Sequence, residues 1–323
     1  MLPLPATSSR LRAFTLVELM VAASVLSILV LMFSSIFSSA SRAWIVGSGN
    51  VERRRNVRAL TDFIGNELKA AMLPVQTVSG STTGNLQFLV DPSNTQVPAA
   101  YQNSDCVFWQ APLATESTYG DIAEIGYFVK WQDDGKGNSV PTLCRFFVNP
   151  SVRASDGSLG VNPDYLIFDP DKNRWLSPPV IDDVAPATAA TGYRGVFGEN
   201  VVGLWIRCYG LDGTELPRSF DSRVGYSCKM QQPDANGNPQ TWQETRYLPA
   251  KIEVSIVQVD SHYAPRLAAA GPAIRTLTST NSIRDAEQFL EAYRTQALGS
   301  TPLKALLPGL RIYSTEVLLT NAQ

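Results

Sequence analysis

A run of nineteen residues without a charged side chain, residues 19–37, constrains the fold of this chain more than any other feature. At about 1.5 Å per residue, a helix over this run spans roughly 28 Å, close to the thickness of a bilayer core. Arg10 and Arg12 precede the run, and Glu18 falls in the first turn of the expected helix. A carboxylate is costly in lipid, so its presence there indicates a function.

Two interpretations fit a basic start followed by an apolar run. In a secretory signal peptide the cleavage site follows the apolar core, and the small residues 38–41 resemble such a site. The run is longer than the core of such a peptide, however. In the second interpretation the cleaved bond lies before the core, between Ala13 and Phe14, and the helix stays in the mature protein.

The second interpretation rests on a resemblance. Ala13-Phe14-Thr15-Leu16-Val17-Glu18, followed by an apolar helix, resembles the class III signal of type IV prepilins and type II secretion pseudopilins. The resemblance implies that a prepilin peptidase cuts after Ala13, where the family usually has Gly, and methylates the new amino group of Phe14.

The same resemblance gives Glu18 a role. It matches the family's glutamate near the mature N-terminus, which faces the N-terminus of a neighbouring subunit in the filament. A buried carboxylate needs a partner, and the Phe14 ammonium of an adjacent subunit can be one. The helix dipole also favours an acid in the first turn. The alternative is that Glu18 lies near the lipid headgroups.

Composition predicts a β-rich globular part after this helix. Charged residues make up 17% of the chain and the net charge is −2, which favours neither a nucleic-acid-binding nor a disordered protein. Aromatic residues make up 9%, and Val, Thr and Tyr recur in short runs, as in strands. We therefore expect an α+β fold in which a long N-terminal transmembrane or stalk helix packs on a head of antiparallel sheet, as in pilins.

The expected organisation has three parts: a leader over residues 1–13, a transmembrane or filament helix over 14–45, and a periplasmic head over 46–323. Gly47-Ser48-Gly49 is expected to kink or break the helix. An amphipathic helix follows over 51–73, and Pro74 ends it. Its apolar face is expected to pack on a sheet; it consists of Val57, Leu60, Ile64, Leu68 and Met72.

The rest of the head, 84–323, is expected to be β-rich. Apolar runs predict strands at 86–90, 106–109, 123–131, 142–148, 201–209, 250–259 and 312–319. The cluster 133–138 predicts a hairpin turn between the third and fourth of these. Segments 149–200 and 210–249 are expected to hold long loops. A helix is expected over 282–298, capped by Ser282. Its apolar face consists of Ile283, Ala286, Phe289, Leu290, Tyr293 and Ala297.

A second, looser resemblance lies in these strands. Glu124-Ile125-Gly126-Tyr127-Phe128-Val129 with Leu143-Cys144-Arg145, and residues 202–209 with 248–254, are similar to the paired strands of J-type minor pseudopilins and their W-type pilus relatives. The chain is longer than the usual J-type protein. A similar layout also occurs in large prepilin-like cassette proteins of the Verrucomicrobia.

Four cysteines, Cys106, Cys144, Cys208 and Cys228, lie far apart without a CxxC pair. This spacing disfavours a zinc ribbon or a thioredoxin-like site. In an exported head they are candidates for one or two disulfides, with three full pairings open; buried thiols are the alternative.

The scarcity of candidate catalytic and metal-binding residues predicts a protein that is not an enzyme and holds no cofactor. His262 is the one histidine, at a strand end, and is expected on the surface. Asp169-Pro170-Asp171-Lys172-Asn173 fails as a calcium loop because Arg174 replaces the needed glycine. Residues 234–238 are an equally weak candidate, better explained by turn chemistry.

Four tryptophans and one basic run are the other residues that bear on contacts with partners. Trp131 and Trp205 are expected in the core, whereas Trp175 and Trp242 lie in loop-rich segments and are candidates for contact with a partner or glycan. The basic run Arg53-Arg54-Arg55 with Arg58 is best explained by a solvated helix face or filament salt bridges, and no nucleic acid is expected.

The expected function is that of a minor pilin-like (pseudopilin) subunit of a type II secretion or type IV pilus system. Its expected partners are prepilin peptidase, other minor pilins or pseudopilins, the inner membrane and secreted cargo. It is expected to be single-pass, with the N-terminus cytoplasmic, the head periplasmic, and assembly into a filament. The alternatives are a filament-tip adhesin or uptake module, and a membrane-anchored hydrolase.

Overall fold

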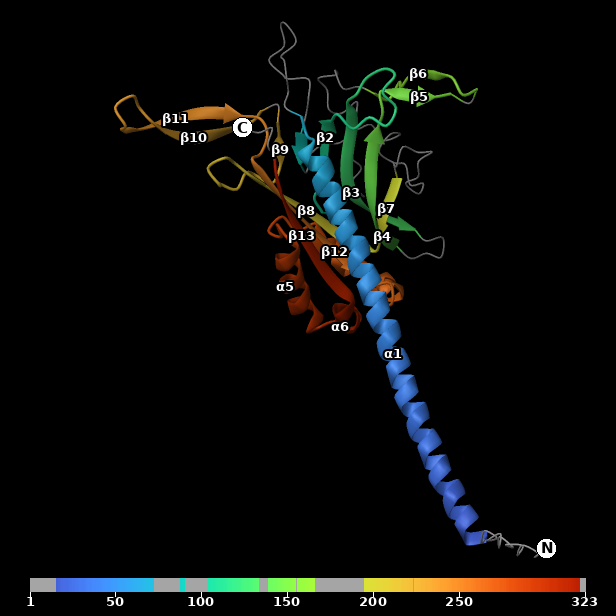
Figure 1. The fold of residues 1–323 in the computed structure, drawn as a ribbon. Coiled ribbons are helices and arrows are strands. Elements are labelled where there is room, and N and C mark those ends of the chain that lie inside the picture. The colour runs from blue at the N-terminus through green and yellow to red at the C-terminus, as the bar shows by residue number, and fades with distance from the viewer. Residues whose placement is uncertain are drawn as a thin grey trace, which may run out of the picture. The chain divides into compact units, whose positions relative to one another are not determined.

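The structure is a computed structural model that describes residues 16–72, 88–90, 104–133, 139–154, 156–165, 195–222 and 224–319. The chain divides into two compact units, Met1–Val57 and Arg58–Gln323. The second unit, the head, consists of antiparallel sheets and short helices together with the C-terminal part of the first helix (Figure 1). The expected α+β class with a β-rich antiparallel head is confirmed.

Helix α1 runs from Leu16 to Lys69 without interruption. The expected break at Gly47-Ser48-Gly49 is wrong, because the helix continues through these residues. Each glycine costs only about 1 kcal/mol relative to Ala in a helix, and no proline removes a hydrogen bond there. The helix also ends four residues before the expected end at residue 73, as the backbone turns at Ala70.

The larger sheet has six strands in the order β7-β4-β3-β2-β1-β9, and every neighbouring pair is antiparallel. Its strands are β1 (Phe88–Val90), β2 (Val107–Ala111), β3 (Ala123–Asp133), β4 (Ser139–Val148), β7 (Gly195–Glu199) and β9 (Phe220–Asp221). Strands β3 and β4 pair from Glu124↔Val148 to Asp133↔Ser139, so the expected hairpin is confirmed. Its connecting residues 134–138 lie outside the described residues.

The smaller sheet has three strands in the order β13-β12-β8. They are β8 (Val201–Tyr209), β12 (Lys251–Val259) and β13 (Leu310–Leu318). The helices α4 (Leu267–Thr278), α5 (Ala286–Ala297) and α6 (Thr301–Leu306) lie beside this sheet, with α5 in contact with all three strands (Figure 1). Two short helical turns, Ala264–Arg266 and Leu307–Gly309, flank α4 and α6.

All seven expected strands are present, but the expected loops contain further strands. Segment 149–200 holds a small ribbon of β5 (Ser151–Arg153) and β6 (Leu159–Val161), as well as β7. Segment 210–249 holds a long ribbon of β10 (Tyr226–Pro233) and β11 (Pro239–Arg246). Helices α4 and α6 were also not expected. Helix α5 is confirmed, but its cap is Asp285, which accepts a hydrogen bond from the Gln288 amide, and not Ser282.

Both faces of the six-stranded sheet are buried. One face, with the smaller sheet, the helices and residues 58–72, forms the main core, which includes Trp109, Tyr127 and Trp205. The opposite face carries a second cluster: Leu89, Cys106, Phe108, Phe128, Cys144, Phe146 and Val148. Strand side chains alternate between the two faces, so both sets of positions are apolar.

Residues 58–72, here called the docked segment, attach the end of α1 to the sheets of the head. Ile64 and Leu68 are fully buried, as their helical spacing predicts. The backbone approaches β13 closely at Gly65, where a Cβ would lie 3.4 Å from Val317 Cγ2. Beyond the helix, the Met72 amide donates to the Gln110 carbonyl on β2 at 3.1 Å.

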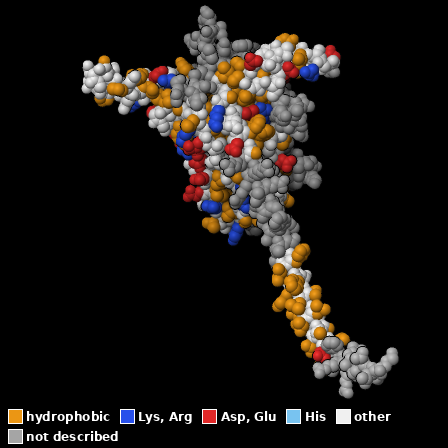
Figure 2. Space-filling model, viewed as in Figure 1, with side chains coloured by type: hydrophobic (Ala, Val, Ile, Leu, Met, Phe, Trp, Pro, Cys, Tyr) orange, Lys and Arg blue, Asp and Glu red, His pale blue; other side chains and the backbone are white. Residues whose placement is uncertain are grey.

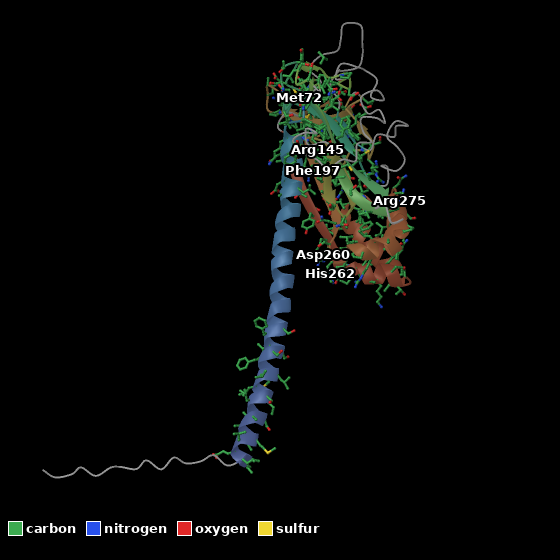
Figure 3. The ribbon with its side chains drawn as sticks, turned by 90° about the vertical axis from the view of Figure 1, so that its right-hand side faces the viewer. Met72, Arg145, Phe197, Asp260, His262 and Arg275 are labelled. Atoms are coloured by element: carbon green, nitrogen blue, oxygen red, sulfur yellow. The ribbon has the colours of Figure 1, made fainter. Side chains whose placement is uncertain are left out.

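A buried ion pair fixes the docked segment on the large sheet. Arg145 on β4 donates from Nη2 to Glu67 Oε1 at 2.5 Å and from Nε to Oε2 at 3.2 Å. The Tyr127 hydroxyl on β3 donates to the same Oε2 at 2.5 Å. The Arg145 guanidinium also lies 4.1 Å from the Phe147 ring centre. Figure 3 shows Arg145 beside the last turns of α1.

The surroundings of this pair exclude water. Glu67 is 7% exposed, Arg145 4% and Tyr127 not at all. Burial raises the pKa of Tyr127 well above its usual value, and the negative charge of Glu67 raises it further. The tyrosine therefore remains a hydrogen-bond donor to the carboxylate at neutral pH.

Removal of one partner of this pair is expected to destabilise the head strongly. Glu67→Ala leaves the Arg145 charge buried without its carboxylate, which costs about 3–5 kcal/mol. The free energy of unfolding, followed by tryptophan fluorescence of the detergent-solubilised chain, measures the loss. As a control, Glu316→Ala breaks the exposed pair between Lys251 and Glu316 and should cost below about 1 kcal/mol. Equal losses in the two variants would contradict a stabilising role for the buried pair.

The raised pKa of Tyr127 predicts a loss of stability at alkaline pH. The unfolded chain loses the tyrosine proton from about pH 10, whereas the folded chain retains it to a higher pH. The contribution of Tyr127 to stability is therefore intact below about pH 10 and is lost as the pH rises further. In Tyr127→Phe this fall should be shallower by up to about 1.4 kcal/mol per pH unit. An unchanged slope in a pH series of urea unfolding would contradict the assignment.

Candidate assembly helix and surface sites

The N-terminal part of α1 is long and apolar enough to cross a membrane. This part covers Leu16–Ser38, 23 residues, and its side chains are exposed throughout. Figure 2 shows it as a band of hydrophobic side chains. A helix apolar all round is suited to a bilayer or to the core of a helical assembly. It is the one such helix in the part of the chain that the structure describes.

Two serines in this apolar part satisfy their hydroxyl groups within the helix. Ser24 Oγ donates to the Met20 carbonyl and Ser27 Oγ to the Ala23 carbonyl, both at 2.8 Å. A hydroxyl bonded in this way does not need a partner from water or from another helix. These serines therefore lower the cost of placing the helix in lipid.

Glu18 is the acidic residue in the first turn of α1, and its side chain is exposed. The free amide groups and the dipole at a helix N-terminus favour a carboxylate at this position. The structure therefore places Glu18 at the end of the helix nearest to Ala13 and Phe14. Those two residues lie outside the described residues.

The basic run Arg53-Arg54-Arg55 with Arg58 lies on the same continuous helix. Its side chains lie outside the described part, so the expectation of a solvated face or filament salt bridges stays a prediction.

The structure holds all four cysteines as buried thiols. Phe128 pairs with Cys144, and the register Val107↔Tyr127, extended by one residue, places Cys106 on the other side of Phe128. Two strand spacings are about 9.6 Å, beyond the Cα separation of about 7 Å that a disulfide permits. A Cys106–Cys144 bridge therefore does not fit this sheet. Burial also raises the pKa of Cys208, which keeps its sulfur in the unreactive thiol form.

The candidate catalytic and metal-binding residues are not brought together. His262 is exposed, as expected, and its amide donates to Asp260 Oδ1 at 2.9 Å in a turn (Figure 3). Within the described ranges, no group of three His, Cys, Asp or Glu side chains could hold a metal ion. Asp169-Pro170-Asp171-Lys172-Asn173 lies outside them.

The weak calcium candidate at 234–238 is a turn. Asp234 Oδ1 accepts hydrogen bonds from the amides of Asn236 and Asn238, both at 2.8 Å. These bonds lower the pKa of Asp234. The carboxylate therefore stabilises the loop between β10 and β11, as the turn interpretation predicts.

The tryptophans divide between core and surface. Trp131 and Trp205 are buried, as expected, and Trp109 is buried with them. Trp242, a contact candidate, is 38% exposed on β11. Trp175, the other candidate, lies outside the described residues.

Sequence reasoning missed the contact between Glu67, Arg145 and Tyr127. One signal was available, since Glu67 lies three residues after Ile64 and next to Leu68, on the apolar face of an amphipathic helix. A charge on such a face requires a partner. The partner could not be named, because it lies 78 residues further along the chain.

Comparison with known proteins gives one match. Residues 8–34 match the family described as the prokaryotic N-terminal methylation motif. No curated protein and no solved structure matches the chain significantly. The matched residues contain Ala13, Phe14 and Glu18, and they include most of the apolar part of α1. The motif implies processing by a prepilin peptidase and assembly with other pilins, and it supports a type IV pilin-like protein with a prepilin-type N-terminal segment.

Proposed function

We propose that the protein is a minor pilin-like (pseudopilin) subunit that primes or joins a periplasmic filament of a type II secretion or type IV pilus system. The observation that carries this proposal is the continuity of the methylation motif with an exposed apolar helix whose first turn contains Glu18. The stretches whose sequences are similar to paired strands of J-type and W-type minor subunits do pair, β3 with β4 and β8 with β12, which supports the proposal.

The proposed organisation is a leader over 1–13, a membrane and filament helix over 14–45 and a head from residue 46. Arg10 and Arg12 precede the apolar part and favour a cytoplasmic N-terminus. The head would then be periplasmic, with a single pass through the inner membrane. In the membrane the helix is surrounded by lipid, and in the filament the same apolar surface packs on other subunits.

A role as a filament-tip binding module is a second candidate, and one observation favours it. The β10–β11 ribbon carries the exposed Trp242 outside the main core. Retention of the head on glycans would support this role, and genes for secretion or for pili next to its own would distinguish the two systems. A role as an anchored hydrolase has no comparable support.

Processing by a prepilin peptidase is the first test. Co-expression with the peptidase should remove residues 1–13 and add one methyl group to Phe14, as measured by the intact mass of the membrane-extracted chain. Ala13→Gly should be cleaved at least as fast, because Gly is usual in the family. Ala13→Leu should not be cleaved and should keep residues 1–13. Cleavage near residues 38–41 instead would identify a secreted protein and overturn the proposal.

The role of Glu18 is the second test. Glu18→Val should still be cleaved and bound to the membrane, but its incorporation into filaments should fall roughly tenfold or more, because the Phe14 ammonium of the neighbouring subunit loses its partner. Quantitative blotting of sheared filaments measures the incorporation. Ser27→Val is the control, since the Ser27 hydroxyl bonds within its own helix and should be dispensable. Normal incorporation of Glu18→Val would exclude the salt bridge.

A further inference from the structure

The β10–β11 ribbon is the longer of the two two-stranded sheets in the described part of the head, and most of its residues are exposed. Its eight consecutive pairs run from Tyr226↔Arg246 to Pro233↔Pro239 without a bulge. Neither strand pairs with a third strand in the described part of the chain. Figure 1 shows the ribbon extending outward from the sheets of the head. Cys228 is its one fully buried side chain.

The ribbon is ordered at both ends. At the tip, Asp234 accepts hydrogen bonds from two amides, and Gly237 adopts a φ of +84°. At the base, Gly225 has a φ of +68°, and a Cβ there would lie 2.5 Å from the Arg246 carbonyl oxygen. The Tyr226 ring packs against Phe220, 6.2 Å between centres. These contacts set the register of the two strands.

A two-stranded ribbon leaves the backbone hydrogen-bonding groups of its outer edges exposed. An isolated two-stranded hairpin is only marginally stable in water, and a third strand stabilises it. The outer edges also present backbone N–H and C=O groups, which natural edge strands protect with charges, bulges or prolines. On β11 the five residues 239–243 are all exposed, carry no charge and contain one proline, at the tip. The outer part of this edge therefore lacks protecting charges, whereas Glu244 and Arg246 carry charge nearer its base.

The two faces of the ribbon are unequal. Met230 on β10 lies directly opposite Trp242 on β11, so both point to the same face. Alternate residues on the other face are polar: Ser227, Lys229, Gln231, Thr241, Gln243 and Thr245. Trp and Met are enriched in the centres of protein interfaces. The Met230–Trp242 pair is therefore the apolar centre of an otherwise polar surface.

We propose that the ribbon is a dimerisation arm, in which β11 of one copy pairs antiparallel with β11 of a second copy about Trp242. Such two-fold pairing uses the same patch on both subunits. It places the two Trp242 side chains opposite each other, each flanked by its own Met230, in one apolar row across four strands. The paired backbones satisfy the exposed edge groups of both copies.

The charges of the ribbon permit this self-pairing. In a register centred on Trp242, Glu244 lies opposite Gln240 of the second copy, and Arg246 lies opposite Asn238. Like charges directly opposite each other would oppose pairing, and this register has none. Strand β10 is less suited, because its base is held against the head through Tyr226 and Cys228.

The contact is short, so it acts on copies that are already concentrated. Both chains would be anchored by the apolar part of α1 in one membrane, which raises the effective concentration of each arm for the other. The arm lies in the head and does not require cleavage after Ala13. It therefore does not depend on the proposed processing or filament assembly and can be tested on the unprocessed chain.

Disulfide trapping in membranes tests the register. Two differently tagged full-length chains are co-expressed, one with Thr241→Cys and the other with Gln243→Cys, which the pairing places opposite each other. Mild oxidation should join the two tags. In the control, Gln231→Cys replaces Thr241→Cys. Residue 231 lies on the same face of the ribbon but one strand further away, about 9.6 Å from residue 243 of the second chain. This pair should therefore give little cross-linked product. Chains without added cysteines set the background, because the natural ones are buried.

The Trp242 side chain is tested in the same assay. Trp242→Ala in both chains should lower the yield of the Thr241–Gln243 product roughly tenfold, and Trp242→Phe should retain most of it. Resistance of the head to limited proteolysis shows that the variants remain folded. Equal yields from the Thr241 and Gln231 chains, no product, or trapping of a different protein in place of the second copy would each overturn the proposal.

Discussion

The buried contact between Glu67, Arg145 and Tyr127 determines how the end of α1 meets the head. Apolar side chains alone would allow a helix to slide or rotate on a sheet at low cost. The Glu67 carboxylate accepts three hydrogen bonds from Arg145 and Tyr127. These bonds fix the helix in one position, because any shift leaves a buried charge without its partners. The six-stranded sheet and the docked segment are thereby held in one register.

The two units of the chain meet different physical requirements. Leu16–Ser38 is apolar along its length, and the hydroxyls of Ser24 and Ser27 are bonded within the helix, which suits lipid as well as packing against other helices. The head, in contrast, encloses its apolar residues around both faces of the large sheet.

The surface of the head has one feature that the core does not explain. The β10–β11 ribbon adds almost nothing to the buried core, and it exposes Trp242 and an edge whose outer part lacks protecting charges. Features of this kind destabilise an isolated chain or promote its aggregation unless a partner covers them. The assembly of a pilin-like subunit therefore need not depend on α1 alone, and the head can contribute its own contacts between subunits.

Sequence alone predicts the apolar helix, the processing motif, Glu18 and the seven strands with apolar patterns, because each depends on residues adjacent in the chain. It missed β10 and β11, whose side chains are polar and exposed and so show no apolar period. The expected break of α1 at Gly47 was wrong, because local propensity does not include the cooperative hydrogen bonds of a long helix. The partner of Glu67 and the separation of Cys106 from Cys144 become visible only in the folded head. Both depend on the register between distant strands, which is set by the packing of the whole head.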